Sequence, residues 1–330
     1  MSDTPNIVRA AYVELISTDL ERAKWFWVDM LGFVLTAEDP DALYLRGYEE
    51  ANHHSLVLRR GDAPAAACIS FRVWAPEDLD VASAWYGERG CRVERRPAGA
   101  TRGIGEAIRV EDPLGFTVEY FHATDRVERL LQRYDVHRGA GIARIDHFNI
   151  CVDDPAAAHD FYGSLGFRCS ETIEGNDRMY AAWMHRKPSV HDIALTGGAS
   201  PRLHHVGWFA PEQHHITRLC DTFGAIGEQA HIERGPGRHG VSNAFYVYLR
   251  DHDGHRIEVY TSDYFTGDPD HETLRWDVND VRRRDFWGAA VVPSWYAEAT
   301  DVLDLDGKVV ATRSVDESTS EARVGADGFR

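Results

Sequence analysis

The alternation of apolar and polar residues predicts a chain of short β-strands separated by single helices. The segment RIDHFNICV (144–152) is typical of these strands. Side chains on a strand repeat their direction every second residue, so Ile145, His147 and Asn149 share one face. One face of this strand therefore presents two polar side chains with nitrogen or oxygen atoms.

Helix and turn signals follow the strands. The aspartates at 153–154 offer a helix N-cap, and Pro155 suits the first turn of the helix that we expect over 156–165. Gly166 is a plausible C-terminal glycine for this helix. Later in the chain, Asp253–Gly254 separates two strand-like segments and predicts a β-hairpin.

This order of elements recurs four times, with modules that begin near residues 8, 67, 143 and 203. The second half of the chain repeats the first: 13–33 aligns with 147–167, 68–80 with 203–215, and 109–121 with 249–261. We expect an α+β fold of four tandem βαβββ modules that form two barrel-like domains. The predicted divisions are a non-catalytic pair of modules (1–122), a partly helical linker (123–142), a catalytic pair (143–262), and a C-terminal tail over the active site (263–330).

Composition narrows the function classes. The 330 residues suffice for two domains with their own cores, and the formal net charge is −17. Such an acidic chain is not expected to bind nucleic acid, and an anionic ligand would need local arginines. Five scattered cysteines indicate reduced thiols. Without a signal pattern or a long apolar run, we expect a cytoplasmic protein with no membrane partner.

The repeat also reveals a candidate metal site, because only the second half has a histidine at two aligned positions. The alignment sets His147 opposite Val13, His205 opposite Ser70, and Glu258 opposite Glu119. If equivalent strands line one trough, two histidines and a glutamate converge there. This ligand set leaves coordination positions open and suits Fe(II) oxygen chemistry. His204 is the alternative to its neighbour as ligand, although strand alternation favours His205. Glu119 alone is expected to be structural.

Specific motifs carry a resemblance to a known family. They are DHFN (146–149), LHHV (203–206) and HRIEVY (255–260), with the longer segments 180–198, 233–270 and 282–296. The chain resembles the type I extradiol catechol dioxygenases of the vicinal oxygen chelate superfamily, most closely the branch that acts on a carboxymethyl catechol. The resemblance covers nearly the whole chain. It implies one Fe(II), or Mn(II), per subunit, a homotetramer and a role in aromatic catabolism.

The implied reaction is cleavage of 3,4-dihydroxyphenylacetate by O₂ to 5-carboxymethyl-2-hydroxymuconate semialdehyde. The resemblance implies metal ligation by His147, His205 and Glu258, catalytic roles for His191, His239, Tyr248 and Asn149, and substrate contacts for Arg234, Arg284, Trp183, His239 and Tyr248. In this scheme His191 shuttles protons beside the O₂ site, and the two arginines hold the substrate carboxylate. We expect Arg282 to be solvated, and the Gly- and Pro-rich segment 234–240 to be a loop able to close.

Three alternatives stay open at this point. The enzyme could act on another carboxylated catechol. The same modules also carry isomerases and lyases that use a metal without consuming O₂, and oxygen uptake distinguishes these. A non-catalytic binding protein is the third alternative, and it predicts that the two histidines and the glutamate hold no metal.

Overall fold

The computed structural model describes residues 4–315, which divide into two compact units. Unit 1 contains the residues up to Asp146 together with Asp301–Ala311, and unit 2 contains His147–Thr300 and the described residues from Thr312 onward. The predicted linker lies within unit 1 and contains no helix, while the predicted tail is shared between the units. The last part of that tail, 316–330, is outside the described residues.

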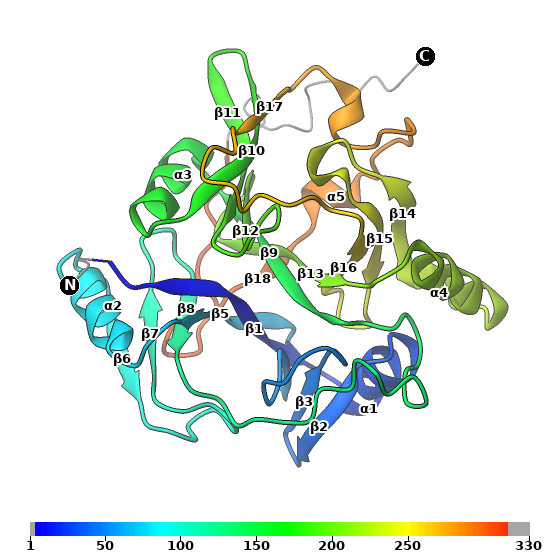
Figure 1. Ribbon diagram of the computed structural model, residues 1–330, viewed down its shortest axis with the longest axis horizontal. Helices are drawn as coiled ribbons and strands as arrows, with labels where there is room; N and C mark the ends of the chain where they lie inside the picture. The colour runs from blue at the N-terminus through cyan, green and yellow to red at the C-terminus, as the bar shows by residue number, and fades with distance from the viewer. Residues whose placement is uncertain (1–3, 316–330) are drawn as a thin grey trace. The chain divides into compact units, whose positions relative to one another are not determined.

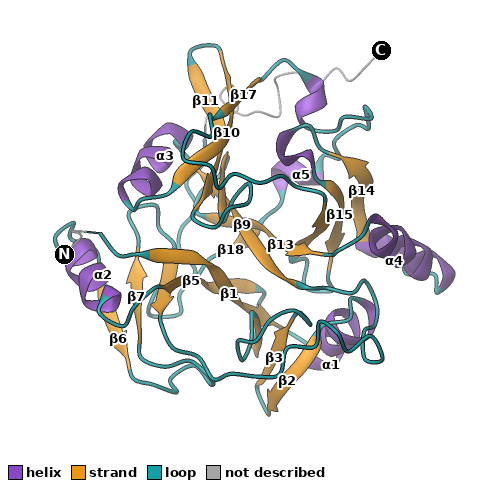
Figure 2. Cartoon of the chain, viewed as in Figure 1, coloured by secondary structure: helices purple, strands orange, loops and turns teal. Residues whose placement is uncertain are grey.

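Unit 1 consists of two βαβββ modules whose strands form one sheet (Figures 1 and 2). The sheet order is β2-β3-β4-β1-β5-β8-β7-β6, so the first strands of the two modules are neighbours and pair antiparallel. Asp19 begins the first helix by accepting hydrogen bonds from two backbone N–H groups. The elements are β1 (Ile7–Ser17), α1 (Leu20–Lys24), a π-helical turn (Trp25–Met30), β2 (Val34–Asp39), β3 (Ala42–Arg46), β4 (Leu56–Arg60), β5 (Ala65–Val73), α2 (Asp78–Gly87), β6 (Val93–Arg96), β7 (Ala107–Glu111) and β8 (Thr117–Phe121).

The second pair of modules has the same arrangement, with the order β14-β15-β16-β13-β9-β12-β11-β10-β17. In Figure 1, α3 lies beside β10 and β11, and α4 lies beside β14. The α+β fold with four βαβββ modules is thereby confirmed. The elements are β9 (Arg144–Val152), α3 (Pro155–Ser164), β10 (Arg168–Gly175), β11 (Arg178–His185), β12 (Ile193–Gly197), β13 (Arg202–Phe209), α4 (Gln213–Ala225), β14 (Ile232–Arg238), β15 (Phe245–Arg250) and β16 (Arg256–Thr261), followed by β17 (Leu274–Asp277), α5 (Ser294–Ala297) and β18 (Thr300–Asp301), with 3₁₀ turns at Gln229–His231, Val241–Asn243 and Val281–Arg283.

The predicted local signals are confirmed where they can be checked. Asp154 caps α3 by accepting from two backbone N–H groups, and Gly166 beyond the helix has φ of +82°. Asp251 organises the hairpin between β15 and β16 by accepting from the Asp253 and His255 amides, and Gly254 has φ of +81°. Short-range capping and turn chemistry therefore set the ends of these elements.

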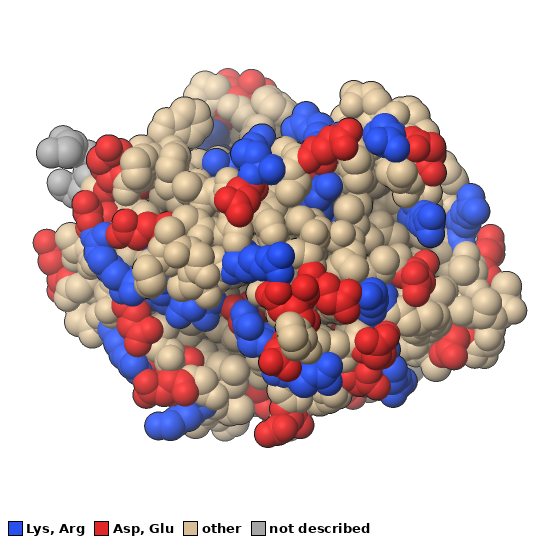
Figure 3. All heavy atoms as spheres, turned by 90° about the horizontal axis from the view of Figure 1, so that it is seen from below, with Lys and Arg blue, Asp and Glu red and all other residues tan. Residues whose placement is uncertain are grey.

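Acidic and basic side chains are interspersed on the face drawn in Figure 3, and that face shows no extended basic patch. No helix among residues 4–315 is long and apolar enough to cross a membrane.

The structure corrects the alignment of the first strands by one residue. The Val13 amide donates to the Ser55 carbonyl, and in unit 2 the Phe148 amide donates to the equivalent Asp192 carbonyl. Val13 is therefore the counterpart of Phe148, and Tyr12 is the counterpart of the histidine at 147. The extra residue lies in the helical segment of unit 1: Asp19 and Gly32 are 13 positions apart and enclose a π-helical turn, whereas the equivalent Asp154 and Gly166 are 12 positions apart.

A second correction concerns β5 and β13. Ser70 pairs with Glu119 across the sheet, whereas Gly207 pairs with Glu258. Ser70 is thus the counterpart of Gly207. Two positions earlier on the same strand, Cys68 is the counterpart of the histidine at 205.

Candidate metal centre

Three donor atoms from three strands of unit 2 converge on one point. His147 on β9, His205 on β13 and Glu258 on β16 are all buried. The Nε2 atoms of His147 and His205 lie 3.0 and 3.2 Å from Oε2 of Glu258, and 3.4 Å from each other. Donors that bind one ion at about 2.1 Å and at right angles are separated by about 3.0 Å. The spacing of these three atoms therefore fits a single divalent metal ion.

The His147 ring fits because the facing residue, Gly207, has no side chain. A Cβ atom at Gly207 would lie 2.1 Å from Cε1 of His147 and 2.3 Å from its Nε2. Contacts this short exclude any larger residue at position 207 unless the imidazole moves. The sequence pattern did not single out Gly207, because its role depends on a contact between two strands.

The charge states of these groups suit metal ligation. Burial would raise the pKa of Glu258, but the surrounding imidazoles, above all those of His147 and His205, outweigh it and hold the pKa well below its usual range. Burial lowers the pKa of His205 to about 4. The carboxylate is therefore ionised and the His205 imidazole neutral at physiological pH, which are the ligating forms.

A second group of polar side chains surrounds the carboxylate. The Tyr248 hydroxyl lies 2.8 Å from Oε1 of Glu258 and 2.9 Å from Nε2 of His239. The other ring nitrogen of His239 donates to the Arg284 carbonyl at 2.6 Å. With its proton used there, the neutral ring keeps Nε2 as an acceptor. Burial, followed by the neighbouring carboxylate, raises the pKa of Tyr248 well above normal, so its hydroxyl stays protonated.

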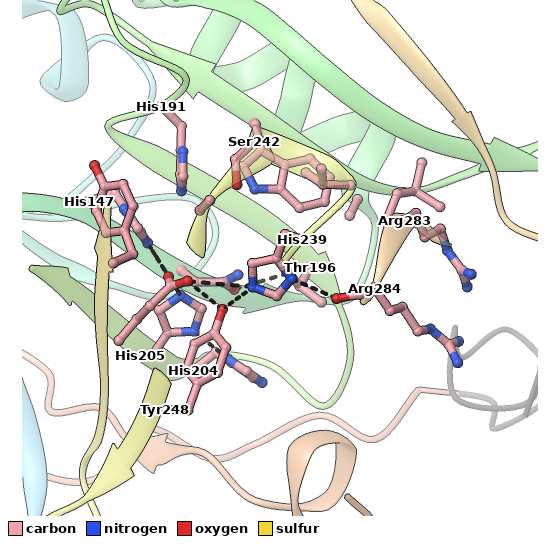
Figure 4. Close-up of a pocket in the computed structure, with 18 of the residues that line it drawn as sticks. His147, His191, Thr196, His204, His205, His239, Ser242, Tyr248, Arg283 and Arg284 are labelled. Carbon is pink, nitrogen blue, oxygen red and sulfur yellow. Dashed lines mark hydrogen bonds and ion pairs between the residues drawn. The ribbon is translucent and has the colours of Figure 1, made fainter. Parts of the chain in front are cut away.

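The remaining predicted residues line the same pocket. The rings of His191 and His147 are 3.8 Å apart between centroids, and Figure 4 shows His191 extending toward His147 and His205. Asn149 accepts a hydrogen bond from the Thr196 hydroxyl at 3.0 Å. Trp183 also contributes to the wall. The structure thus brings together every side chain predicted from the sequence, while their functional roles stay predictions.

Arg283 and Arg284 lie at the opposite end of the pocket from His147 in Figure 4, and Arg234 lines the pocket as well. Arg234 is buried, stacks 4.6 Å from the Trp295 ring, and has an Nε with no hydrogen-bond partner among residues 4–315. Arg284 and the fully buried Arg283 also line the pocket. Arg282 is exposed and paired with an aspartate, as expected for a solvated charge. A buried cation with an unused donor suits an anionic ligand group.

Two features of this end differ from the sequence-based expectation. The Gly- and Pro-rich segment is not a loop through residue 238, because 232–238 form β14 and pair with β15. Among the lining residues to which the sequence analysis gave no role are Thr196, Ser242, Arg283 and Trp295. A run of arginines in an acidic tail was the only signal for Arg283. The pocket encloses about 720 Å³, its mouth included.

The equivalent place in unit 1 holds a guanidinium instead of metal ligands. Tyr12 and Cys68 stand where unit 2 has its histidines, and the Tyr12 hydroxyl donates to Glu119. Arg109 pairs with Glu119 across the sheet, as Tyr248 pairs with Glu258. Its guanidinium lies 2.6 Å from Glu119 and 2.7 Å from Glu14. Glu119 is thus a structural carboxylate.

Comparisons with known proteins agree with this geometry. The model of the Glyoxalase/Bleomycin resistance protein/Dioxygenase superfamily matches residues 9–120 and 144–259. The chain is 30% identical to a manganese-dependent 2,3-dihydroxybiphenyl 1,2-dioxygenase of Geobacillus genomosp. 3, over 86% of this chain and 94% of that one. It is 28% identical to a metapyrocatechase of Geobacillus stearothermophilus, over 90% of this chain and 94% of the relative.

Solved structures are more similar still. The homoprotocatechuate 2,3-dioxygenase of Brevibacterium fuscum, in its anaerobic complex with 3,4-dihydroxyphenylacetate, superimposes with a TM-score of 0.93 at 53% identity. That match covers 94% of this chain and 98% of the other. A variant of the same enzyme gives a TM-score of 0.95 at 52% identity, over 97% of this chain and 89% of that one.

Proposed function

Because the chain belongs to the Glyoxalase/Bleomycin resistance protein/Dioxygenase superfamily, we propose that it is an extradiol dioxygenase that cleaves 3,4-dihydroxyphenylacetate. One O₂ is consumed, and the product is 5-carboxymethyl-2-hydroxymuconate semialdehyde. The observation that carries the proposal is a single pocket lined by His147, His205 and Glu258 and also by three arginines, of which Arg283 and Arg284 lie at the far end from His147 in Figure 4. A catechol with an acidic side chain matches both ends.

His147, His205 and Glu258 would hold one Fe(II), or Mn(II), per subunit, since both ions accept this ligand set. When bound, the ion would supply Lewis-acid chemistry that favours deprotonation of the catechol and the approach of O₂ to the ring. The donor spacing and the charge states described above support this assignment.

The neighbouring side chains would manage the protons. The Tyr248 hydroxyl can donate a hydrogen bond to a catechol oxygen, and Nε2 of His239 can accept a phenolic proton. His191, whose ring lies next to that of His147, would return a proton during the reaction. Asn149 would face the same side of the site as His191, held by Thr196.

Arg234 and Arg284, with Arg283, would bind the carboxymethyl group, and Trp183 would contact the ring. Their cationic end offsets the unfavourable field of a chain with net charge −17. The further assignments that we propose are a role in aromatic catabolism, assembly as a homotetramer and a cytoplasmic location.

The test uses apo-protein reconstituted with Fe(II) or Mn(II) under anaerobic conditions. Addition of 3,4-dihydroxyphenylacetate and O₂ should consume equal amounts of the two and form a yellow semialdehyde. No oxygen uptake with either ion would contradict the proposal and favour a non-oxidative isomerase or lyase. Uptake only with a different carboxylated catechol would correct the substrate.

Substrate choice is tested with Arg234→Met. Loss of a charge-assisted contact worth about 1.5–3 kcal/mol should raise KM for 3,4-dihydroxyphenylacetate about 10- to 150-fold. KM for the uncharged 4-methylcatechol should change little. Arg282→Met, which removes an exposed arginine from the neighbouring run, is the matched control. Equal losses on both substrates would show that Arg234 does not bind the carboxylate.

A further inference from the structure

The second nitrogen of the His205 imidazole faces another imidazole. Nδ1 of His205 lies 2.7 Å from Nδ1 of His204, and Nε2 of His204 lies 2.9 Å from the Trp295 carbonyl oxygen. A metal-ligating histidine usually supports its other nitrogen on a carboxylate, a carbonyl or water. Here a side chain on the same strand stands between the candidate ligand and a backbone carbonyl.

Which ring nitrogens carry a proton follows from which of the contacting atoms can only accept a hydrogen bond. A carbonyl oxygen only accepts, so Nε2 of His204 carries a proton and donates it to Trp295. If His205 ligates through Nε2, its own proton must be on Nδ1. That proton then points at Nδ1 of His204, which must be the bare nitrogen of a neutral ring. The two imidazoles and the carbonyl thus form one directed chain of hydrogen bonds.

The accepting carbonyl is itself held in place. Trp295 is part of α5, a short helix that has no counterpart in the repeats. The buried guanidinium of Arg256 donates to the Ser294 carbonyl at 3.0 Å and to the Glu298 carbonyl at 2.9 Å, on either side of Trp295. It also donates to the His204 carbonyl at 3.1 Å. The Trp295 ring packs 4.4 Å from the His204 ring.

We infer that His204 is a positioning residue, which fixes the tautomer and orientation of His205 by accepting its Nδ1 proton, while the Trp295 carbonyl keeps Nδ1 of His204 free to accept. The inference rests on the proposed metal centre and deepens it. It gives the Trp295 carbonyl of α5 a defined task, which is to fix the tautomer of His204. Residues that support a ligand in this way typically change metal affinity by about 10- to 100-fold when they are replaced.

Two substitutions of similar size separate this role from simple packing. In His204→Asn, Oδ1 takes the place of Nδ1 and still accepts from His205, although the contact with Trp295 is lost. In His204→Gln, the side-chain amide reaches the Trp295 carbonyl but places no acceptor next to His205. His185→Gln is the control, because His185 is a buried histidine of β11 that does not line the pocket.

The measurement is the Mn(II) dissociation constant of folded apo-protein, from the EPR signal of free Mn(II), with thermal unfolding recorded for each variant. We expect His204→Gln to bind Mn(II) about 10- to 100-fold more weakly, and His204→Asn and His185→Gln to lose well under tenfold. Equal affinities in the Gln variant and the wild type, or equal losses in the Gln and Asn variants, would overturn the inference. A wild-type protein that binds no metal would instead contradict the proposed function.

If His204→Gln does not fold, the wild-type protein provides the test. Imidazole ¹⁵N shifts of the Zn(II)-loaded, ¹⁵N-histidine-labelled protein report which ring nitrogen carries the proton. The inference requires a neutral His204 with its proton on Nε2. A proton on Nδ1, or on both nitrogens, would overturn it.

Discussion

Replacing Arg109 by methionine should destabilise unit 1 strongly. The guanidinium contacts Glu14 and Glu119, whose side chains are 5% and 0% exposed. Methionine keeps much of the volume but leaves two buried carboxylates without their shared cation. Removing one partner of a buried ion pair costs about 3–5 kcal/mol. For a unit of this size, that corresponds to a fall in Tm of roughly 6–20 °C.

The loss should depend on pH in a defined direction. Burial would raise the pKa of Glu14, but Arg109 and then Arg59 outweigh it and lower the pKa. The wild-type carboxylate therefore stabilises the fold above its unfolded pKa, about 4.3, and this contribution disappears as pH falls through the lower folded value. In the variant, the penalty for a charged buried carboxylate is present at pH 7 and shrinks as pH approaches about 4.

Urea and thermal unfolding at pH 7 and pH 5, followed by circular dichroism, measure both effects. Arg92→Met is the matched control, because Arg92 is 41% exposed and pairs with three surface carboxylates. Surface pairs of this kind contribute about 0–1 kcal/mol. A loss in Arg109→Met no larger than in Arg92→Met, or a loss that grows toward acid pH, would contradict this description of unit 1.

Two further predictions concern unit 2. Gly207→Ala should displace the His147 ring and therefore weaken Mn(II) binding. Gly224→Ala is the control, because its added Cβ meets nothing within 4 Å, and it should leave the Mn(II) dissociation constant unchanged. Equal affinities in both variants would show that the ring has room to move. Glu171→Leu should lower the unfolding free energy by several kcal/mol, because the buried carboxylate accepts hydrogen bonds from Tyr264, Trp276 and the Ser242 amide at 2.6–2.7 Å. Glu171→Gln keeps an acceptor oxygen and should lose less. Identical urea midpoints for the two variants would show that these hydrogen bonds do not stabilise the fold.

The module order and element ends were predictable because they depend on local signals. Alternation identifies strands, and aspartate caps and glycine turns act within a few residues of chain. The pairing between repeats was wrong by one residue at Tyr12 and by two at Cys68. The first offset arises because unit 1 has one more residue between Asp19 and Gly32 (13 positions) than unit 2 has between Asp154 and Gly166 (12 positions), and a π-helical turn lies in that segment. The second arises because Cys68 and Pro76 are 8 positions apart, whereas His205 and Pro211 are 6 apart.

In the candidate site, too, some residues could be predicted from the sequence and others only from tertiary contacts. His147, His205 and Glu258 stood out because the repeat supplied a second copy that differs at two aligned positions. Arg283 and Trp295 come from a segment with no repeat counterpart, and they reach the pocket only through tertiary contacts. Gly207 is explained only by the ring that it admits. No pattern within the sequence marks Trp295 or Gly207, and only the run of arginines marks Arg283.

The central claim is that one divalent metal ion binds to His147, His205 and Glu258. Elemental analysis of protein reconstituted with Fe(II) or Mn(II) tests it most directly, with Glu258→Gln compared against Glu119→Gln, the equivalent change in unit 1. We predict one ion per chain in the wild type and in Glu119→Gln, and a loss of most of this metal in Glu258→Gln. Wild-type protein that retains no ion, or a Glu258→Gln variant that retains a full complement, would contradict the claim.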